Sequence, residues 1–353
     1  MKIIHTSDIH LDSPLTSRLT PEMAKGRRRE LLAGFSRLIN DAKGLSVDAV
    51  IIAGDLFDNE KVSKRALDTA IDVITSAPEI KFFYLPGNHE KGALLSGERE
   101  IPKNLFIFGE EWTYFKANDV VIAGRSRCSE GMLESLDLRE ENKNIVVLHG
   151  ELRDRCASPD IVGLKDMAER NIDYLALGHY HSYRSYKIPG GGSAVYCGTP
   201  EGRGFDEDGE CGYVLIDTRN EIDYRFVPFA KRRIHVVKTD VGGLSTLGEV
   251  KEAISSSLIG IKREDIVRLE LVGQKQLDLW LDEDALAERF KNAFYYFEIK
   301  NSTRLLIKKE DHLYDKSLRG EFIRLVEARD DLDEITKEKI IETGLYALMG
   351  EEV

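Results

Sequence analysis

The chain has 353 residues, of which 32% are charged and 42% hydrophobic, and its formal net charge is −12. Because one domain usually spans roughly 100–200 residues, this length predicts a large domain with a smaller companion. The acidic balance argues against a protein that only coats nucleic acid, since neutralising phosphates requires basic residues.

Sequence patterns exclude several other classes. No apolar run approaches the ~18 residues of a membrane span. The N-terminal segment Met1–Asp8 carries a carboxylate where a signal peptide needs apolar residues. The four cysteines form no Cys-x-x-Cys pair, so we expect reduced thiols rather than a disulfide framework. We therefore expect a soluble, cytoplasmic globular protein without a membrane partner.

The first part of the chain predicts strands that alternate with helices. Apolar runs predict strands at residues 2–6, 47–53 and 82–85, and helical spacing of apolar residues predicts helices at 28–42 and 64–77. This order is typical of a sheet built at least partly from parallel βαβ units.

Two further buried strands are predicted at residues 145–148 and 174–177. All five strands are followed directly by polar residues. Because ligands bind at the carboxyl ends of the strands in open α/β sheets, five separate loops are expected to assemble one site.

The pattern changes after about residue 194, where short strands with turn residues predict antiparallel strands that complete a second sheet. We predict a domain boundary near Lys231. A small α+β domain is expected beyond it, with strands at 234–237, 266–272, 293–299 and 303–307 and helices at 246–258 and 284–291. The last forty residues show helical spacing of apolar residues.

Residues that can bind metal follow each of the five strands. The motifs, in chain order, are Asp8-x-His10, Gly54-Asp55-x-x-Asp58, Gly87-Asn88-His89-Glu90, His149-Gly150 and Gly178-His179-x-His181. Carboxylates, neutral imidazoles and an amide oxygen are the mixture that holds Mn²⁺, Fe²⁺ or Zn²⁺ in sites of five or six ligands. The glycines before Asp55, Asn88 and His179 are expected to permit the tight turns that direct each side chain inward.

A carboxylate has two oxygens and can bridge two cations, which together can clamp a phosphate and activate water. The alternative is that the motifs are unrelated core or surface residues. Five such motifs, each directly after a strand, make that alternative the weaker one.

The five motifs, in this order, resemble those of the calcineurin-like metallophosphoesterases. The segments at 5–14, 54–58 and 87–90 resemble the DNA double-strand-break repair nuclease subunits of the SbcD or meiotic-recombination-eleven type, and the first is similar to bacterial YhaO-like members. The resemblance covers residues 1–230 well and 231–353 mainly by arrangement.

This resemblance implies an α/β metallophosphoesterase fold, a two-sheet β-sandwich flanked by helices. It places the nuclease domain in residues 1–230, an α+β DNA-recognition cap domain in 231–312 and a helical C-terminal tail, which binds an ATPase partner, in 313–353.

The resemblance also assigns site residues and a cofactor of two divalent metal ions, typically Mn²⁺. It implies that one ion is held by Asp8, His10, Asp55 and His181, and the other by Asp55, Asn88, His149 and His179, with Asp55 bridging. His89 would instead contact the scissile phosphate and assist the leaving oxygen, a role that imidazole suits because its pKa lies near neutrality. Asp58 stands where many archaeal and eukaryotic members have a second histidine that is linked to exonuclease action.

The function implied is a metal-dependent exonuclease on double-stranded DNA ends and endonuclease on single strands, acting as a homodimer with a coiled-coil ABC-type ATPase. A phosphatase or nucleotide phosphodiesterase with the same dinuclear centre is the alternative. A scaffold without activity is disfavoured, because all seven predicted ligands and His89 are present.

Some residues outside the motifs have two interpretations. Arg232 and Arg233, at the predicted boundary, suit DNA phosphate contact and plain solubility equally. The run Arg27–Arg29 is expected to be mainly a solvated helix face, and Trp280 to lie in a core. A C-terminal apolar stripe could close a core or bind the ATPase, and we slightly favour the partner. Its residues are Leu318, Phe322, Leu325 and Val326.

Overall fold

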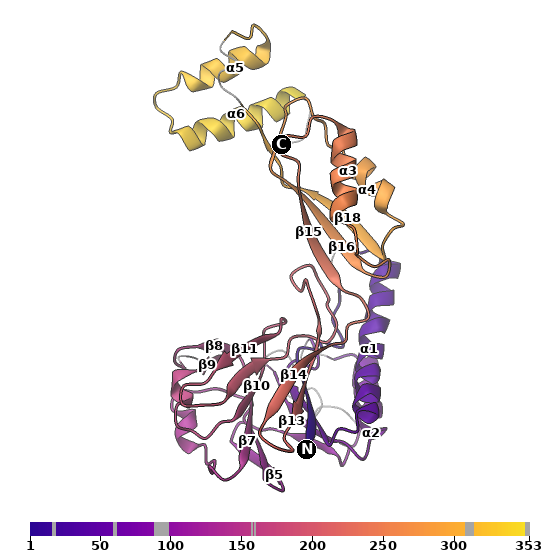
Figure 1. The fold of residues 1–353 in the computed structure, drawn as a ribbon, viewed down its shortest axis with the longest axis vertical. Coiled ribbons are helices and arrows are strands. Elements are labelled where there is room, and N and C mark those ends of the chain that lie inside the picture. The colour runs from indigo at the N-terminus through magenta and orange to yellow at the C-terminus, as the bar shows by residue number, and fades with distance from the viewer. Residues whose placement is uncertain are drawn as a thin grey trace. The chain divides into compact units, whose positions relative to one another are not determined.

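The computed structural model describes residues 1–15, 19–58, 62–87, 99–156, 158, 160–307 and 314–349. The chain divides into two units, Met1–Ile234 and His235–Val353, whose elements are drawn in Figure 1. The predicted boundary near Lys231 lies close to this division. The predicted start of the tail at residue 313 lies outside the described residues. Among the helices of the described residues, none combines the length and the apolar character needed to cross a membrane.

Two mixed sheets, each of six strands, make up most of the described part of the first unit. The first sheet has the order β14 (Asp223–Pro228), β13 (Gly212–Asp217), β1 (Lys2–Thr6), β2 (Ala49–Ala53), β3 (Lys81–Leu85) and β4 (Leu105–Ile107). The second has the order β11 (Arg184–Lys187), β12 (Ser193–Tyr196), β10 (Tyr174–Gly178), β7 (Lys143–His149), β6 (Val120–Gly124) and β5 (Thr113–Ala117). The strands β1 to β4 are parallel, as are β12, β10, β7 and β6, so their carboxyl ends lie at one edge of each sheet.

The sheets pack face to face, and the alternation of side chains along each strand determines which core a residue joins. In β1, Ile3 belongs to the core between the sheets, together with Val147 of β7. Its neighbour Ile4 faces the opposite side and joins a core with the helices α1 (Pro21–Gly44) and α2 (Lys64–Thr75).

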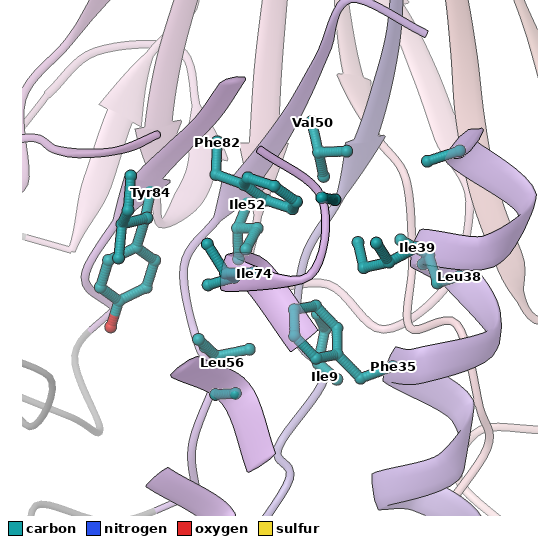
Figure 2. Packing of buried hydrophobic residues seen from close by; sticks show 14 of the residues in the cluster. Ile9, Phe35, Leu38, Ile39, Val50, Ile52, Leu56, Ile74, Phe82 and Tyr84 are labelled. Carbon is teal, nitrogen blue, oxygen red and sulfur yellow. The ribbon is translucent and has the colours of Figure 1, made fainter. Parts of the chain in front are cut away.

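Figure 2 shows this helix-facing core, in which Phe35, Leu38 and Ile39 of α1 lie near Val50 and Ile52 of β2. Full burial of a side chain such as Phe35 stabilises the fold by roughly 1.5–3 kcal/mol. These contacts fix α1 across the outer face of the first sheet.

The helix α1 begins seven residues before its predicted start at residue 28. The Thr20 side chain accepts a hydrogen bond from the backbone of Met23, and Pro21 occupies the first turn, where its missing N–H costs nothing. The start of α1 is therefore set by its cap rather than by the first apolar residue of the stripe.

The outer face of the second sheet is covered by short elements. They are two 3₁₀ helices, η1 (Met132–Ser135) and η2 (Lys165–Met167), and the small strand pair β8 (Glu151–Arg153) and β9 (Ile161–Gly163). Met132, Met167 and Val162 from these elements share a core with the outward-facing residues of β7 and β10.

The second unit contains a three-stranded sheet with a core of its own. Its strands lie in the order β15 (Ile234–Asp240), β16 (Ile266–Val272) and β18 (Tyr296–Asn301), and its helices are α3 (Leu247–Ser257) and α4 (Glu283–Phe290). Val250 of α3, Leu269 of β16 and Leu286 of α4 meet in this core.

The C-terminal helices α5 (Leu318–Glu327) and α6 (Glu334–Met349) share a second core with β19 (Arg304–Leu305), the strand that pairs with β17 (Gln274–Lys275). Leu305 of β19 packs with Ile323 and Leu345 of the two helices. The backbone N–H of Leu305 also donates to the Glu342 carboxylate at 3.1 Å. These helices are therefore packed into the second unit by contacts with the segment predicted as the cap.

Predictions from residue type were wrong at two positions. Arg28 and Arg29 are exposed, as predicted for the run 27–29, but Arg27 is fully buried. Its guanidinium donates to the Glu30 carboxylate at 2.6 Å and to the Gly202 carbonyl at 2.7 Å. Trp280 is 53% exposed, so it is not a core residue in the second unit.

Candidate metal centre

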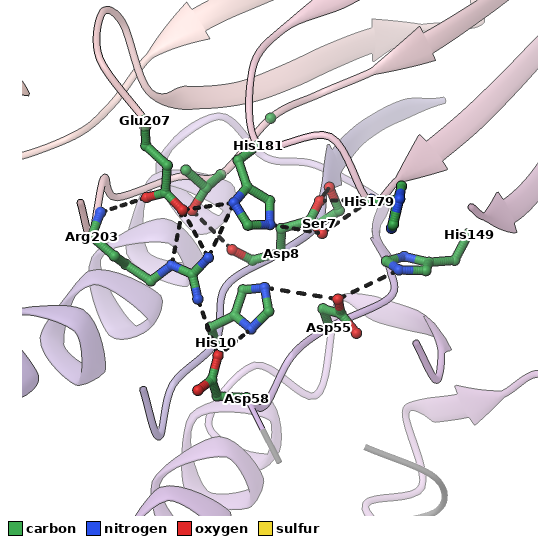
Figure 3. A network of polar contacts seen from close by, with 12 residues as sticks. Ser7, Asp8, His10, Asp55, Asp58, His149, His179, His181, Arg203 and Glu207 are labelled. Atoms are coloured by element: carbon green, nitrogen blue, oxygen red, sulfur yellow. Dashed lines mark hydrogen bonds and ion pairs between the residues drawn. The ribbon is translucent and has the colours of Figure 1, made fainter. Parts of the chain in front are cut away.

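Acidic and histidine side chains from four strand ends converge in the first unit (Figure 3). Potential ligand atoms of Asp8, His10 and His181 all lie within 4.8 Å of one another. The same holds for Asp8, Asp55 and His149. The loops after β1, β2, β7 and β10 thus meet at one place, as the sequence predicts.

The two carboxylates lie between the imidazoles. Oδ2 of Asp55 is 3.8 Å from Nε2 of His10 and 3.4 Å from Nε2 of His149. Oδ1 of Asp8 is 3.8 Å from Nε2 of His181. Asp8 belongs to both clusters, and Asp55 has an imidazole on either side, so the geometry is compatible with the bridging role predicted for Asp55.

The remaining predicted ligands are placed less completely. The His179 ring lies beside that of His149, with 5.6 Å between ring centroids, and its backbone N–H donates to both carboxylate oxygens of Asp8 at 3.0 and 3.1 Å. Asn88 and His89 lie outside the described residues. Their predicted roles stay predictions.

Each of three imidazoles has its Nδ1 atom held from outside the cluster. Nδ1 of His149 lies 2.9 Å from the Ala53 carbonyl oxygen. Nδ1 of His10 lies 2.9 Å from a carboxylate oxygen of Asp58, and Nδ1 of His181 lies 2.7 Å from Oε1 of Glu207. These acceptors favour the tautomer with hydrogen on Nδ1, which leaves the Nε2 lone pair directed at the cluster.

The backbone at the site adopts conformations that most residues avoid. Asp8, His10, Asp55 and His179 all have positive φ, between 47° and 108°. Such conformations cost of order 1–3 kcal/mol each and persist where the surrounding fold imposes them. The strain is therefore concentrated at the residues that form the cluster.

Glycines supply the space around the cluster. A Cβ on Gly87 would lie 2.0 Å from Oδ1 of Asp55, and one on Gly178 would lie 2.0 Å from the Ala53 carbonyl oxygen. No positive φ occurs at either position, so these glycines are needed for close approach rather than for the tight turn that the sequence predicts. At Gly54, which has φ of +96°, both reasons apply.

The charges at the site shift the pKa of its histidines. Burial lowers the pKa of His149, but the hydrogen bond and charge of Asp55 and the charge of Asp8 raise it to about 9. Burial also lowers the pKa of His181. Its contact with Glu207 and the charges of Asp8 and Glu207 together outweigh burial, so the pKa of His181 is raised. Both shifts report a strongly anionic environment.

Several residues of the site were not found by sequence reasoning. Arg203 and Glu207 lie in the segment after β12 and contact Asp58 and His181. The one feature of the sequence that could have identified them is their position after β12, because β12 is a parallel neighbour of β10 and ends at the same edge of the sheet. The hydroxyl of Thr199, which follows β12, donates to the Asp8 backbone carbonyl at 2.8 Å.

The residues predicted to contact substrate have protein partners. Asp58 accepts a hydrogen bond from Nη1 of Arg203 at 3.2 Å, in addition to its contact with His10. Arg232 is largely buried and donates through Nε and Nη2 to the Glu30 carboxylate at 3.0 and 2.7 Å. Arg233 lies 3.6 Å from the Glu210 carboxylate. The predicted contact of these residues with DNA stays a prediction.

The predicted partner-binding stripe divides between two faces of α5. Val326 is buried, and Phe322 packs against the core that α5 and α6 share. Leu318 and Leu325 are 69% and 64% exposed. The stripe is thus part core and part surface, so only its exposed pair is available to a partner.

The donor set fits a pair of divalent cations, because carboxylate oxygens and imidazole Nε2 atoms converge from two overlapping clusters. The family model of the calcineurin-like phosphoesterases matches residues 1–183. The chain belongs to this family. It is a metallophosphoesterase with a candidate dinuclear centre, in which the cations, when bound, polarise phosphate and activate water.

The chain is also similar to individual proteins over more of its length than the family model matches. The chain is 28% identical over 312 residues to the uncharacterized metallophosphoesterase YhaO of Bacillus subtilis, covering 80% of this chain and 74% of that protein. It is 25% identical over 306 residues to the DNA double-strand break repair protein Mre11 of Methanosarcina acetivorans, covering 80% of this chain. It is also 23% identical over 312 residues to a component of the nuclease SbcCD from Staphylococcus saprophyticus, covering 77% of this chain and 78% of that one.

The match to the archaeal Mre11 protein covers only 47% of that relative, so this chain spans about half of its length.

Proposed function

We propose that the chain is a metal-dependent DNA nuclease, an exonuclease on double-stranded ends and an endonuclease on single strands, acting in double-strand-break repair. The observation that supports this proposal most directly is that the similarity to the Mre11 protein extends over 80% of the chain. Such a match is too long to be confined to Met1–Ile234, which forms about two thirds of the chain. The shared sequence therefore includes part of the second unit, beyond the phosphoesterase fold common to the family.

In this proposal the strand-end residues hold two divalent cations, with Mn²⁺ as the expected metal. Asp8, His10, Asp55 and His181 hold one ion, and Asp55, Asn88, His149 and His179 hold the other. The fixed Nδ1 atoms keep the imidazole Nε2 atoms available to the ions. His89 contacts the scissile phosphate and assists departure of the leaving oxygen.

The second unit is proposed to act in recognition. Its strands and α3 and α4 form the DNA-recognition cap, and the exposed Leu318 and Leu325 of α5 offer an apolar contact to a coiled-coil ABC-type ATPase. The staphylococcal relative is named as one component of SbcCD, which supports a role in a complex. A homodimer is expected from the family resemblance.

The test is a gel of end-labelled duplex and single-stranded DNA incubated with the purified full chain, with Mn²⁺ and Mg²⁺ compared. We expect Mn²⁺-dependent degradation of both, abolished by Asp55→Ala and by His89→Gln. Asp119→Ala is the matched control, because Asp119 is exposed and its carboxylate pairs with Lys143 rather than with a residue of the metal centre.

Two results would overturn the proposal. One is full nuclease activity in both site variants. The other is rapid hydrolysis of nucleotides or small phosphate esters with no cleavage of DNA, which would favour a phosphatase or nucleotide phosphodiesterase.

A further inference from the structure

Arg203 connects two carboxylates at the edge of the metal centre. Its Nη1 atom donates to Oδ1 of Asp58 at 3.2 Å, while Nε and Nη2 donate to Oε1 of Glu207 at 3.1 and 2.7 Å. The Arg203 side chain is 13% exposed and that of Glu207 only 2%. We call Asp58, Arg203 and Glu207 the arginine clasp.

The two carboxylates of the clasp each hold a different histidine of the centre. Oδ1 of Asp58 lies 2.9 Å from Nδ1 of His10, and Oε1 of Glu207 lies 2.7 Å from Nδ1 of His181. Nη2 of Arg203 also lies 3.1 Å from Nδ1 of His181. Arginine has no acceptor, so when Nδ1 of His181 carries hydrogen, both groups are donors directed at the same Glu207 oxygen.

The other half of the centre is held differently. Nδ1 of His149 is bound by the Ala53 backbone carbonyl at the end of β2, with no side chain of the clasp between them. The Gly54 backbone then fills the space beside the His149 ring. Thus the backbone of the sheet positions His149, whereas three loop side chains position His10 and His181.

We propose that Arg203 is a positioning residue, which joins Asp58 and Glu207 into one clasp that preorganises His10 and His181 for one of the two metal ions. The inference rests on the proposed metal centre, and it assigns separate structural support to its two halves. Neither Arg203 nor Glu207 belongs to the motifs from which the centre was predicted.

Arginine suits this position because its planar guanidinium presents several donors in a fixed arrangement, whereas a lysine ammonium is a flexible point charge. Without the Arg203 side chain, the carboxylates of Asp58 and Glu207 would lose their shared counter-charge and the donors that join them. Glu207 would keep its hydrogen bond from the backbone N–H of residue 203. Groups that orient ligands from the second layer typically change metal affinity by about 10–100-fold.

The test compares Mn²⁺ binding by the full chain and its Arg203→Met variant, using titration calorimetry and metal analysis. We expect the wild type to bind two ions. In Arg203→Met, the dissociation constant of one ion should rise by about 10–100-fold, while that of the other stays within about twofold. At low temperature, the electron paramagnetic resonance spectrum of the variant should show isolated rather than coupled Mn²⁺.

Three further variants sharpen the result. Arg219→Met is the matched control, because Arg219 is exposed and pairs with Asp217 away from the clasp. Glu207→Gln, which keeps an acceptor for Nδ1 of His181, should weaken the same ion less than Glu207→Ala. If Arg203→Met does not fold, Asp58→Asn tests the same proposal, since it retains the acceptor for His10 and removes one charge from the clasp.

The outcomes separate this inference from the proposed function. Two ions bound with wild-type affinities by Arg203→Met would overturn the clasp and leave the metal centre intact. An equal loss of both ions would also overturn it, because the two halves would then share their support. A wild type that binds two Mn²⁺ ions but does not cleave DNA would overturn the nuclease proposal and leave the clasp standing.

Discussion

Gly54 and His149 approach so closely that a Cβ on Gly54 would lie 2.1 Å from Nδ1 of His149. Gly54 follows β2 in the first sheet and His149 ends β7 in the second, so this contact joins the two sheets at the metal centre. Real Cβ atoms do not occur at such a distance. The His149 imidazole therefore packs directly against the backbone of Gly54, where no side chain intervenes.

The contact predicts the effect of Gly54→Ala. The added methyl group must displace the His149 ring, so we expect the affinity for one Mn²⁺ ion to fall at least about tenfold, as when a group that orients a ligand is lost. The positive φ adds strain of order 1–3 kcal/mol. Titration calorimetry measures the first effect and chemical denaturation the second.

Gly190→Ala is the control for that substitution, because Gly190 has a similar φ of +90° but its Cβ would meet only an ordinary contact at 3.5 Å. It should lower stability and leave metal binding unchanged. Equal Mn²⁺ affinity in Gly54→Ala and the wild type would show that His149 does not depend on this contact.

The Glu30 carboxylate predicts a pH-dependent contribution to stability. Burial raises its pKa, but hydrogen bonds from Arg232, Lys231 and Arg27 lower it to about 2 from an ordinary value of 4.5. A lowered folded-state pKa stabilises the fold above the ordinary value, and this contribution is lost as the pH falls from 4.5 toward 2. We expect Glu30→Gln to lower stability by about 1–3 kcal/mol at pH 7.

The difference between wild type and Glu30→Gln should be constant from pH 7 to about 5 and then narrow as the pH falls. Denaturation curves of both proteins at pH 7, 5 and 4 measure it. A difference that widens toward acid pH would contradict the lowered pKa.

The packing of α6 against β19 predicts local effects in the second unit. Leu345 is fully buried beside Leu305, so Leu345→Ala should cost about 2–5 kcal/mol of local stability. Hydrogen exchange should then become faster in β19 and α5 as well as in α6. Leu348→Ala, at an exposed position of the same helix, should change exchange little. Faster exchange confined to α6 would show that the tail is not part of this core.

The exposed pair on α5 predicts a separable effect on partner binding. Leu318→Asp and Leu325→Asp should each weaken binding to a purified coiled-coil ABC-type ATPase by tenfold or more, about 1.4 kcal/mol, without lowering the thermal midpoint of the free chain. Ile259→Asp is the control, since Ile259 is an exposed apolar residue elsewhere in the same unit. Pull-down and titration with the ATPase measure this. Unchanged affinity in both α5 variants would exclude the pair from the interface.

The sequence predicts the residues of this site that come directly after strands. Asp8, Asp55, His149 and His181 each follow an apolar run, and parallel strands bring such positions to one edge. The spacing of apolar residues likewise predicts the face of α1 that carries Phe35. Residues on one buried face of a helix recur with the helical period, and this period is visible in the sequence.

The residues that sequence does not predict act through contacts between distant loops. Arg203 and Glu207 follow no periodic pattern. Arg203 matters because it contacts Asp58, 145 residues away along the chain, and Glu207 because it contacts His181. Gly87 is hard to interpret from sequence for the same reason. A side chain is excluded there by the nearby Asp55 carboxylate, whose position is known only from the structure. Arg27 looks like surface charge until its hydrogen bond to the Gly202 carbonyl, 175 residues away along the chain, is known.

The segments that build the centre are made far apart in time during protein synthesis. Asp8 and His10 leave the ribosome first, His181 follows much later, and the carboxylate that holds it, Glu207, comes almost at the end of the first unit. An incomplete chain that stops short of Glu207 therefore carries most of the metal-binding residues without the contact that orients His181. The order of the chain delays the complete centre until nearly the whole first unit has been synthesised.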